Sequence, residues 1–310
     1  MAAVVVGIDV SKLHLDVHVR PSAEAFRLGR DEAGLDELVG RLQPLEPALI
    51  ALEATGGFET IVAASLSMAG LPVVIVNPVQ VRAFARALGK RAKTDPIDAA
   101  VIAHFAEATN PAVKPLPDEE TRLLADLLAR RRQIVHMMVA ERQRARVLSS
   151  PRLKQSIARL LKALERELQV LDSDIDDSVR RSPVWREKEN LLTSVPDVGP
   201  VIARTLLAEM PELGSIGRKE AASLAGLAPF TRTSGQWRGK SFIGGGRAPV
   251  RTVLYLGAMS AVRFNPVLQD FYRRLRDAGK APNVALVAVA RKLITILNAI
   301  LRDQKAWRST

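Results

Sequence analysis

The chain has 310 residues, 47% of them apolar, and 45 Lys and Arg against 33 Asp and Glu give a net charge of +12. This length and apolar content predict two or three domains with substantial cores, and the basic balance favours a polyphosphate partner such as nucleic acid. The absence of cysteine excludes disulfides, thiolate zinc sites and cysteine nucleophiles, and the four scattered histidines do not form a metal-ligand pattern.

The first 90 residues alternate strand and helix patterns. Apolar runs predict strands at 4–10 and 48–53, and the period-two pattern of Leu13, Leu15, Val17 and Val19 predicts another at 13–20. Further strands are expected at 25–28 and 72–76, and helices over 31–42, 58–69 and 79–88. Antiparallel strands followed by βαβ units predict an α/β fold with a mixed sheet in a ribonuclease-H-like layout.

The next region is helical. Four leucines between 123 and 128 begin an arginine-rich helix that is expected to end near Leu148, before the break Ser149-Ser150-Pro151. A second helix repeats apolar residues in steps of three and four, at Leu153, Ile157, Leu160, Leu164, Leu168, Leu171, Ile175 and Val179. This predicts a coiled-coil-like hairpin, packed within the chain or used for self-association. Its arginine clusters fit either a solvated face or a nucleic-acid track.

A third region begins near Leu191. Residues 194–200 (SVPDVGP) and the helical pattern at 201–210 resemble a helix-hairpin-helix, in which a tight turn presents backbone N–H groups to a DNA phosphate. Gly is usual where this chain has Asp197, and a carboxylate there repels phosphate, so packing is the better-supported role of the turn. We therefore expect three domains: a catalytic domain over 1–115, a helical linker region over 116–185 and a mainly helical C-terminal domain over 186–310.

Membrane association is not expected. The N-terminus lacks a basic segment followed by a long apolar one, as a secretory signal would have. The apolar stretch 284–290 is interrupted by Arg291 and Lys292 and is too short to span a bilayer. These patterns predict a cytoplasmic protein.

Four carboxylates form the main candidate site. Asp9 in GIDVSK and Glu53 in ALEATGG lie at the ends of predicted strands, and Asp95 and Asp98 are one helical turn apart in KTDPIDAA. Such acids suit two Mg²⁺ ions, which prefer carboxylate oxygen and stabilise phosphodiester transfer in pairs. Each acid has a simpler explanation alone, since Asp95 before a proline also suits a helix N-cap. Their joint occurrence favours a metal site.

A second candidate site lies in the C-terminal region. Ser234 stands in GLAPFTRTSG, followed by GGGR and VR, and this glycine-rich setting suits a hydroxyl nucleophile approaching a phosphodiester. Basic residues in both regions are candidate nucleic-acid contacts that neutralise phosphate charge: Lys12, Lys93, Arg238, Arg247 and Arg251. A lone Ser-Gly is also a common turn.

Together, GIDVSK, ALEATGG, KTDPIDA, VPDVGP and GLAPFTRTSG…GGR…VR resemble the insertion sequence 110 family of transposases, over nearly the whole chain. The related Piv-type DNA invertases share the pattern. The resemblance implies a RuvC-like domain whose DEDD set falls on Asp9, Glu53, Asp95 and Asp98, and a serine nucleophile that falls on Ser234. Asp197 and the GGGR stretch differ from the residues that are most common at these positions in the family.

The same resemblance implies partners and assembly. Family members are guided by a structured noncoding RNA that pairs with donor and target DNA, and they form dimers that join into tetramers with acids and serine from different subunits. Three readings stay open beside an RNA-guided transposase. These are a Piv-type invertase, a RuvC-like endonuclease that uses the acids and water, and a noncatalytic nucleic-acid-binding protein.

Overall fold

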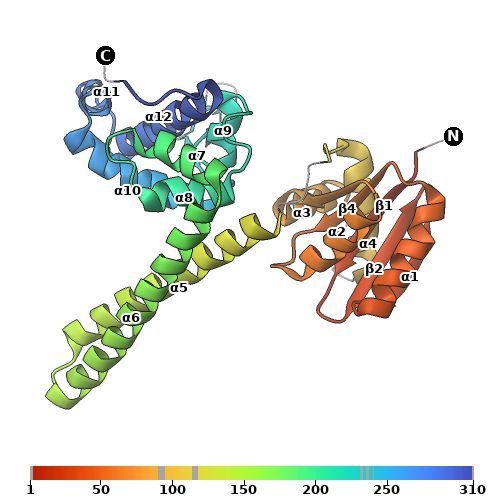
Figure 1. Cartoon of the computed structure of the whole chain (residues 1–310). Helices are drawn as coiled ribbons and strands as arrows, with labels where there is room; N and C mark the ends of the chain where they lie inside the picture. Colours follow the sequence, from red (N-terminus) through yellow and green to blue (C-terminus); the bar gives the residue numbers. More distant parts are fainter. Residues whose placement is uncertain are drawn as a thin grey trace. The chain divides into compact units, whose positions relative to one another are not determined.

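Figure 1 shows a computed structural model of the chain, which describes residues 3–89, 95–113, 118–230, 233–234, 237–239 and 241–308. The side chains of residues 95–97, 233–234 and 237–238 lie outside this description. The chain divides into two compact units, Met1–Pro117 and Asp118–Thr310. The division into three domains stays a prediction, because the contacts group the helical hairpin with the C-terminal body.

The first unit contains a five-stranded mixed sheet. Its spatial order is β3-β2-β1-β4-β5, with antiparallel pairs among the first three strands and parallel pairs from β1 through β4 to β5. The strands are β1 (Val5–Val10), β2 (His14–Arg20), β3 (Glu24–Gly29), β4 (Leu49–Glu53) and β5 (Val73–Val76). The predicted α/β class and mixed sheet are therefore confirmed.

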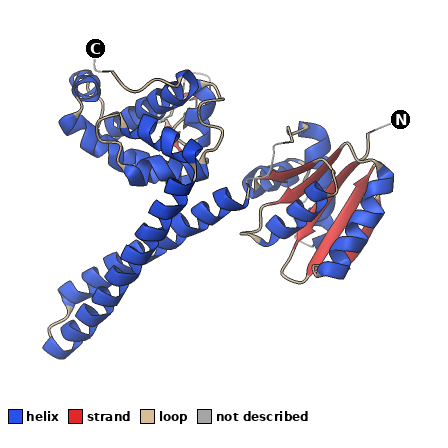
Figure 2. Ribbon diagram, viewed as in Figure 1, coloured by secondary structure: helices blue, strands red, loops and turns tan. Residues whose placement is uncertain are grey.

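Helices pack on both faces of this sheet (Figure 2). They are α1 (Glu32–Leu42), the 3₁₀ turn η1 (Gln43–Leu45), α2 (Phe58–Met68), α3 (Pro78–Ala87) and α4 (Asp95–Thr109). Because strand side chains alternate between faces, Val6 and Ile8 belong to the core under α1 and α2, whereas Val5 belongs to the core under α3 and α4. One expectation is wrong in detail: Leu13 precedes β2 and is exposed, because the chain turns there and Ser11 hydrogen-bonds to His14.

The second unit begins with the expected helical hairpin, formed by α5 (Glu119–Val147) and α6 (Pro151–Arg181). Its apolar contacts form two clusters: Leu124 and Leu128 pack with Ile175 and Val179, and Ile134 and Met138 pack with Leu171 closer to the turn. The predicted seam is incomplete toward the turn, because Leu153 and Leu160 are exposed. Two helices alone cannot cover both sides of an apolar stripe near their free end. Internal packing is confirmed, and self-association stays a prediction.

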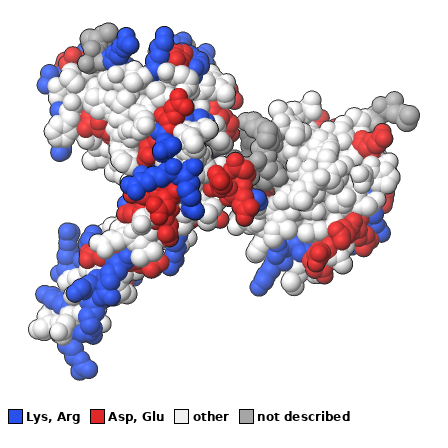
Figure 3. All heavy atoms as spheres, viewed as in Figure 1, with Lys and Arg blue, Asp and Glu red and all other residues white. Residues whose placement is uncertain are grey.

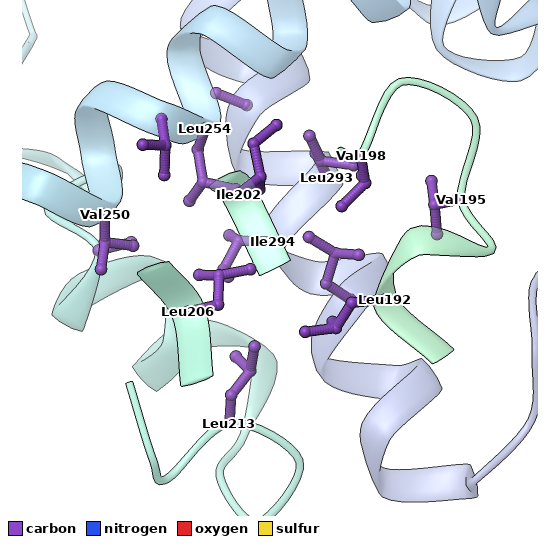
Figure 4. Close-up of a cluster of buried hydrophobic side chains, with 14 of the residues drawn as sticks. Leu192, Val195, Val198, Ile202, Leu206, Leu213, Val250, Leu254, Leu293 and Ile294 are labelled. Atoms are coloured by element: carbon purple, nitrogen blue, oxygen red, sulfur yellow. The ribbon is translucent and has the colours of Figure 1, made fainter. Parts of the chain in front are cut away.

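The C-terminal body is mainly helical, as predicted. It contains α7 (Pro183–Thr193), α8 (Pro200–Glu209), α9 (Arg218–Leu224), α10 (Ala248–Phe264), α11 (Pro266–Asp277) and α12 (Pro282–Asp303). Figure 4 shows its core, where Ile202 and Leu206 of α8 meet Leu254 of α10 and Leu293 and Ile294 of α12.

Within the described part of the chain, α12 alone is long and apolar enough to meet the criteria for a membrane span. Half of its most apolar window is buried in this body. Leu293, Ile294 and Leu297 of the helix have no exposed surface. The apolar residues of α12 are accounted for by the core of the second unit.

Candidate active site

Asp9 and Glu53 lie at the same edge of the sheet. β1 and β4 are parallel neighbours whose register runs from Val5–Leu49 to Ile8–Leu52, so the next residue on each strand is one of these acids. Both side chains are half-buried. Because residues two apart share a face, Asp9 faces the same side as Gly7, and Glu53 the same side as Ala51. The sequence-based placement of both acids at strand ends is confirmed.

Helix α4 packs directly on that face, over Gly7. A Cβ atom built on Gly7 would lie 2.3 Å from the backbone nitrogen of Ala103 and 2.4 Å from the carbonyl oxygen of Ala99. Only glycine therefore lets the α4 backbone come this close to β1. Asp98 directly precedes Ala99, so the first turn of α4 is held near this contact.

An ion pair shows the direction in which α4 crosses the sheet. Arg20 pairs with Val5 across β1 and β2, at the end of β1 opposite Asp9. Its guanidinium contacts Glu107, near the end of α4, at 2.8 Å. Since the end of α4 lies beside the start of β1, the beginning of α4 lies toward the end of β1. Asp98 is thereby brought to the edge that carries Asp9 and Glu53.

The chemistry of this donor set fits a hard divalent cation. Asp9, Glu53 and Asp98 are all half-buried carboxylates at one sheet edge, and oxygen ligands of this kind suit Mg²⁺. Asp95 begins α4, but its side chain lies outside the described residues. The described side chains include no group of three or more Asp, Glu or His close enough to hold an ion. The structure thus brings three acids to one edge without showing a closed coordination shell.

The sequence analysis missed a further acid at this site, Asp16. It stands directly opposite Asp9 in the β1–β2 ladder, so both side chains face α4. Asp16 is only 5% exposed, and Arg27 of β3 binds its two oxygens at 2.9 and 3.1 Å. The guanidinium offsets the charge that a buried carboxylate would otherwise place beside Asp9. The alternation along β2 places Asp16 on the face opposite Leu15 and Val17. It does not show that Asp9 is the cross-strand partner of Asp16, because that depends on the strand register.

A second missed acid, Glu59, braces the loop that follows Glu53. One carboxylate oxygen accepts hydrogen bonds from the backbone N–H of Thr55 at 3.0 Å, the hydroxyl of Thr55 at 3.0 Å and the backbone N–H of Gly57 at 2.9 Å. Burial opposes ionisation of Glu59, but these hydrogen bonds outweigh it and hold its pKa below the usual value. The loop that follows β4 is therefore held by the buried, ionised carboxylate of Glu59.

Ser234 lies in a nested pair of short strands rather than in an open loop. The outer pair joins β6 (Pro229–Phe230) to β9 (Phe242–Ile243), and the inner pair joins β7 (Thr233–Ser234) to β8 (Trp237–Arg238). Ser234 is paired with Trp237. We call residues 229–243 the serine hairpin. Within this glycine-rich segment Ser234 therefore belongs to a strand, and the side chains of Ser234 and Arg238 lie outside the described residues.

Glycine and arginine contacts anchor the base of the serine hairpin. A Cβ on Gly226 would lie 2.3 Å from the carbonyl oxygen of Gly245, and one on Gly246 would lie 2.3 Å from the nitrogen of Gly226. Both glycines have positive φ. Arg251 donates to the carbonyl of Gly245, and Arg247 holds both oxygens of Glu212 at 2.7 Å. The GGGR and VR residues thus have structural partners in this conformation, and their contact with nucleic acid stays a prediction.

The helix-hairpin-helix-like segment has the expected helix–turn–helix form, between α7 and α8. Asp197 has a φ of 72°, in the left-handed region, and its carboxylate accepts a hydrogen bond of 2.8 Å from Ser260 of α10. This contact ties the turn to the core, as the packing role predicted. DNA binding by the turn stays a prediction. Of the two expected lysines, Lys12 is exposed in the turn after β1, and Lys93 lies outside the described residues.

These features first indicate the class of domain to which residues 1–117 belong. A mixed sheet with acids at the ends of two adjacent parallel strands, and a third acid on the helix packed on them, agrees with the RuvC-like domain of the DEDD type that the motif resemblance implies. Comparison with known sequences gives the same result. A model for DEDD-type IS110 proteins, described as a transposase, matches residues 6–150, and a model for the transposase IS116/IS110/IS902 family matches residues 189–273.

Two relatives match most of the chain, and a third matches half of it. The pilin gene-inverting protein of Moraxella bovis is 32% identical over 241 residues, which are 76% of this chain and 74% of that protein. The pilin gene-inverting protein of Moraxella lacunata is 31% identical over 262 residues, 83% of this chain and 80% of that protein. A 43.6 kDa protein of insertion element IS110 from Streptomyces coelicolor is 31% identical over 156 residues, 50% and 38% respectively. The chain belongs to the IS110 family of transposases.

Proposed function

We propose that this transposase cuts and rejoins DNA by a metal-supported serine nucleophile, guided by a structured noncoding RNA. The observation that carries the proposal is the placement of Asp9 and Glu53 at one edge of the sheet, with the α4 turn after Asp98 packed on Gly7, in a chain of a transposase family. The serine hairpin supplies the second reactive group. The acids and Ser234 would act on the same phosphate, whether one copy of the chain or two copies provide them.

The acids would hold the metal. Asp9, Glu53, Asp95 and Asp98 are the proposed ligands of two Mg²⁺ ions, which when bound would supply electrophilic stabilisation of the phosphate oxygens. The protein's own contribution is placement. Gly7 lets α4 approach, and the Arg27–Asp16 pair keeps the neighbouring carboxylate neutralised.

The serine would form a covalent link to DNA. The Oγ of Ser234 would bond to phosphorus as the bond from phosphorus to the leaving sugar oxygen breaks, with the serine proton passing to solvent and the sugar oxygen taking up a proton. One phosphoester replaces another, so the energy of the link is kept for rejoining. In the reverse step, a sugar hydroxyl from another DNA end would displace Ser234.

The basic charge supports the proposed nucleic-acid partners. Between residues 141 and 166, around the turn of the α5–α6 hairpin, there are eight Lys and Arg and two Glu. Figure 3 shows Lys and Arg gathered around the free end of this hairpin. Such a surface attracts donor and target DNA and a guide RNA. Assembly into dimers and tetramers belongs to the same proposal and rests on the family resemblance.

DNA inversion is the second candidate function. Two relatives that cover most of this chain are pilin gene-inverting proteins, and the same residues would serve inversion and transposition. Recombination between plasmid sites in direct or inverted orientation separates the two, because an invertase gives inverted segments and a transposase joins the element to a new target.

The chemistry is tested by recombination of donor and target plasmids with Mg²⁺, with and without the transcribed noncoding segment beside the gene. We expect Asp9→Asn and Ser234→Ala to abolish strand exchange, and a protein–DNA adduct to be trapped only when Ser234 is present. Ser241→Ala, a change at an exposed serine of the same hairpin, is the matched control. Cleavage without an adduct, and unaffected by Ser234→Ala, would instead establish a water-using endonuclease. Recombination that survives loss of the acids would refute the proposed metal site, and DNA binding without any cleavage by the wild-type protein would establish a noncatalytic role.

A further inference from the structure

Two phenylalanines form an exposed stacked pair on the serine hairpin. Phe230 and Phe242 face each other across β6 and β9, with ring centroids 5.7 Å apart and ring planes at 28°. The side chains are 51% and 46% exposed. Large apolar rings usually become buried, so a stacked pair left half in water is a candidate contact surface.

Stabilisation of the hairpin does not account for this exposure. A cross-strand aromatic pair contributes about 0.2–1 kcal/mol to a ladder. The base of the hairpin already has the close contacts of Gly226 with Gly245 and the bidentate Arg247–Glu212 pair. Burying the rings in the C-terminal core would add more stability than leaving them at the surface.

The charge around the pair identifies the occupant. Residues 229–251 include five Lys and Arg and no Asp or Glu. Two of the five have partners in the structure, Arg247 at Glu212 and Arg251 at the carbonyl of Gly245, and the side chains of the other three lie outside the described residues. An aromatic surface in a basic, acid-free segment suits an unpaired nucleobase, because the rings stack on its π-face while the cations contact the adjoining phosphates. Stacking also accepts any base, as a recombinase with changing targets requires.

We propose that Phe230 and Phe242 form a stacking platform for an unpaired nucleobase of the DNA strand that Ser234 attacks. The inference rests on the proposed function for the identity of that strand. Ser234 is four residues from Phe230, within the same hairpin. Stacking a base there holds the neighbouring phosphate at the hairpin and keeps the strand locally open for cleavage.

The test uses the full-length protein and short single-stranded DNA that carries one 2-aminopurine, whose fluorescence falls on stacking. We expect wild-type protein to quench the probe and the Phe230→Ala/Phe242→Ala variant to bind about 5- to 150-fold more weakly, with the quenching lost. Phe230→Trp should retain quenching. Phe264→Ala, a change at a 70% exposed phenylalanine of α10, is the matched control and should bind as wild type.

A leucine variant separates stacking from folding. Phe230→Leu/Phe242→Leu keeps apolar side chains on the hairpin but removes the rings, so quenching should be lost while the melting temperature is retained. Wild-type affinity and quenching in this variant overturn the proposal. Failure of the serine chemistry is distinguishable, because the probe reports stacking in Ser234→Ala protein as well. Full duplex of the same sequence should bind equally to wild type and the leucine variant.

Discussion

Replacing Gly7 by alanine should damage both the stability and the active site of the first unit. The new methyl group would meet backbone atoms of Ala103 and Ala99 at 2.3 and 2.4 Å, about 1 Å closer than ordinary contact allows. Backbone cannot rotate away as a side chain can, so α4 must move off β1. Overpacking of this kind costs about 1–3 kcal/mol.

The same displacement would shift Asp98 away from Asp9 and Glu53. A misplacement of about 1 Å can lower a reaction rate by about 100-fold. We therefore expect Gly7→Ala to lower the urea midpoint of unfolding and to lower recombination by more than the loss of folded protein explains. The two effects are measured on the same preparation, by equilibrium unfolding and by plasmid recombination.

Gly40→Ala is the matched control. Gly40 lies in α1, and a Cβ there meets nothing within 4 Å. Alanine in a helix interior should stabilise the protein by about 0.5–1 kcal/mol and leave recombination unchanged. If Gly7→Ala unfolds and recombines as wild type does, α4 does not depend on this contact, and the argument that brings Asp98 to the sheet edge fails.

Three further predictions concern the loop after β4 and the serine hairpin. Because the pKa of Glu59 is lowered, its ionised form stabilises the fold above the usual carboxyl pKa, and this contribution disappears as pH falls through the lowered value. Urea unfolding of Glu59→Gln should therefore show about 1–3 kcal/mol less stability at neutral pH, and its difference from wild type should shrink as pH falls below the usual carboxyl pKa. Gly226→Ala should loosen the hairpin and speed proteolysis within it, whereas Gly217→Ala, with open space around its Cβ, should not. If Arg247 chiefly braces the hairpin through Glu212, then Glu212→Gln should reduce recombination as much as Arg247→Gln does. If Arg247 instead binds a DNA phosphate, Glu212→Gln protein should bind DNA at least as tightly as wild type in a filter-binding assay.

Much of the first unit was predictable because periodicity decides which face a residue occupies. The apolar runs that lead to Asp9 and Glu53 predicted both acids at strand ends, whereas their shared face follows from the parallel register of β1 and β4. The approach of α4 was not predictable, since it depends on which face of a helix meets Gly7. The two hydrogen bonds from Arg27 to Asp16 were not predictable either, because they depend on the register of β2 and β3, which sequence spacing alone does not determine.

The second unit shows a different limit. The apolar repeat of α6 correctly predicted a long helix that packs within a hairpin. It did not show that Leu171 and Ile175 are buried while Leu153 and Leu160 are exposed. A repeat records which residues face the same side, but burial depends on the partner that covers that side. Self-association remains the explanation to test for the exposed part of the seam.

Different structural elements hold the acids and Ser234, and this difference affects how each would work. Asp9 and Glu53 stand on strands whose neighbouring residues are fully buried, such as Ile8 and Leu52, so the sheet fixes the positions of these two acids. Ser234 stands on a ladder of two-residue strands, and pairing this short is marginal in water. Its position must therefore come from the anchored base of the hairpin and from whatever the hairpin binds. A nucleobase on Phe230 and Phe242 would order the hairpin when the DNA strand is present, so that the serine is positioned only with its substrate.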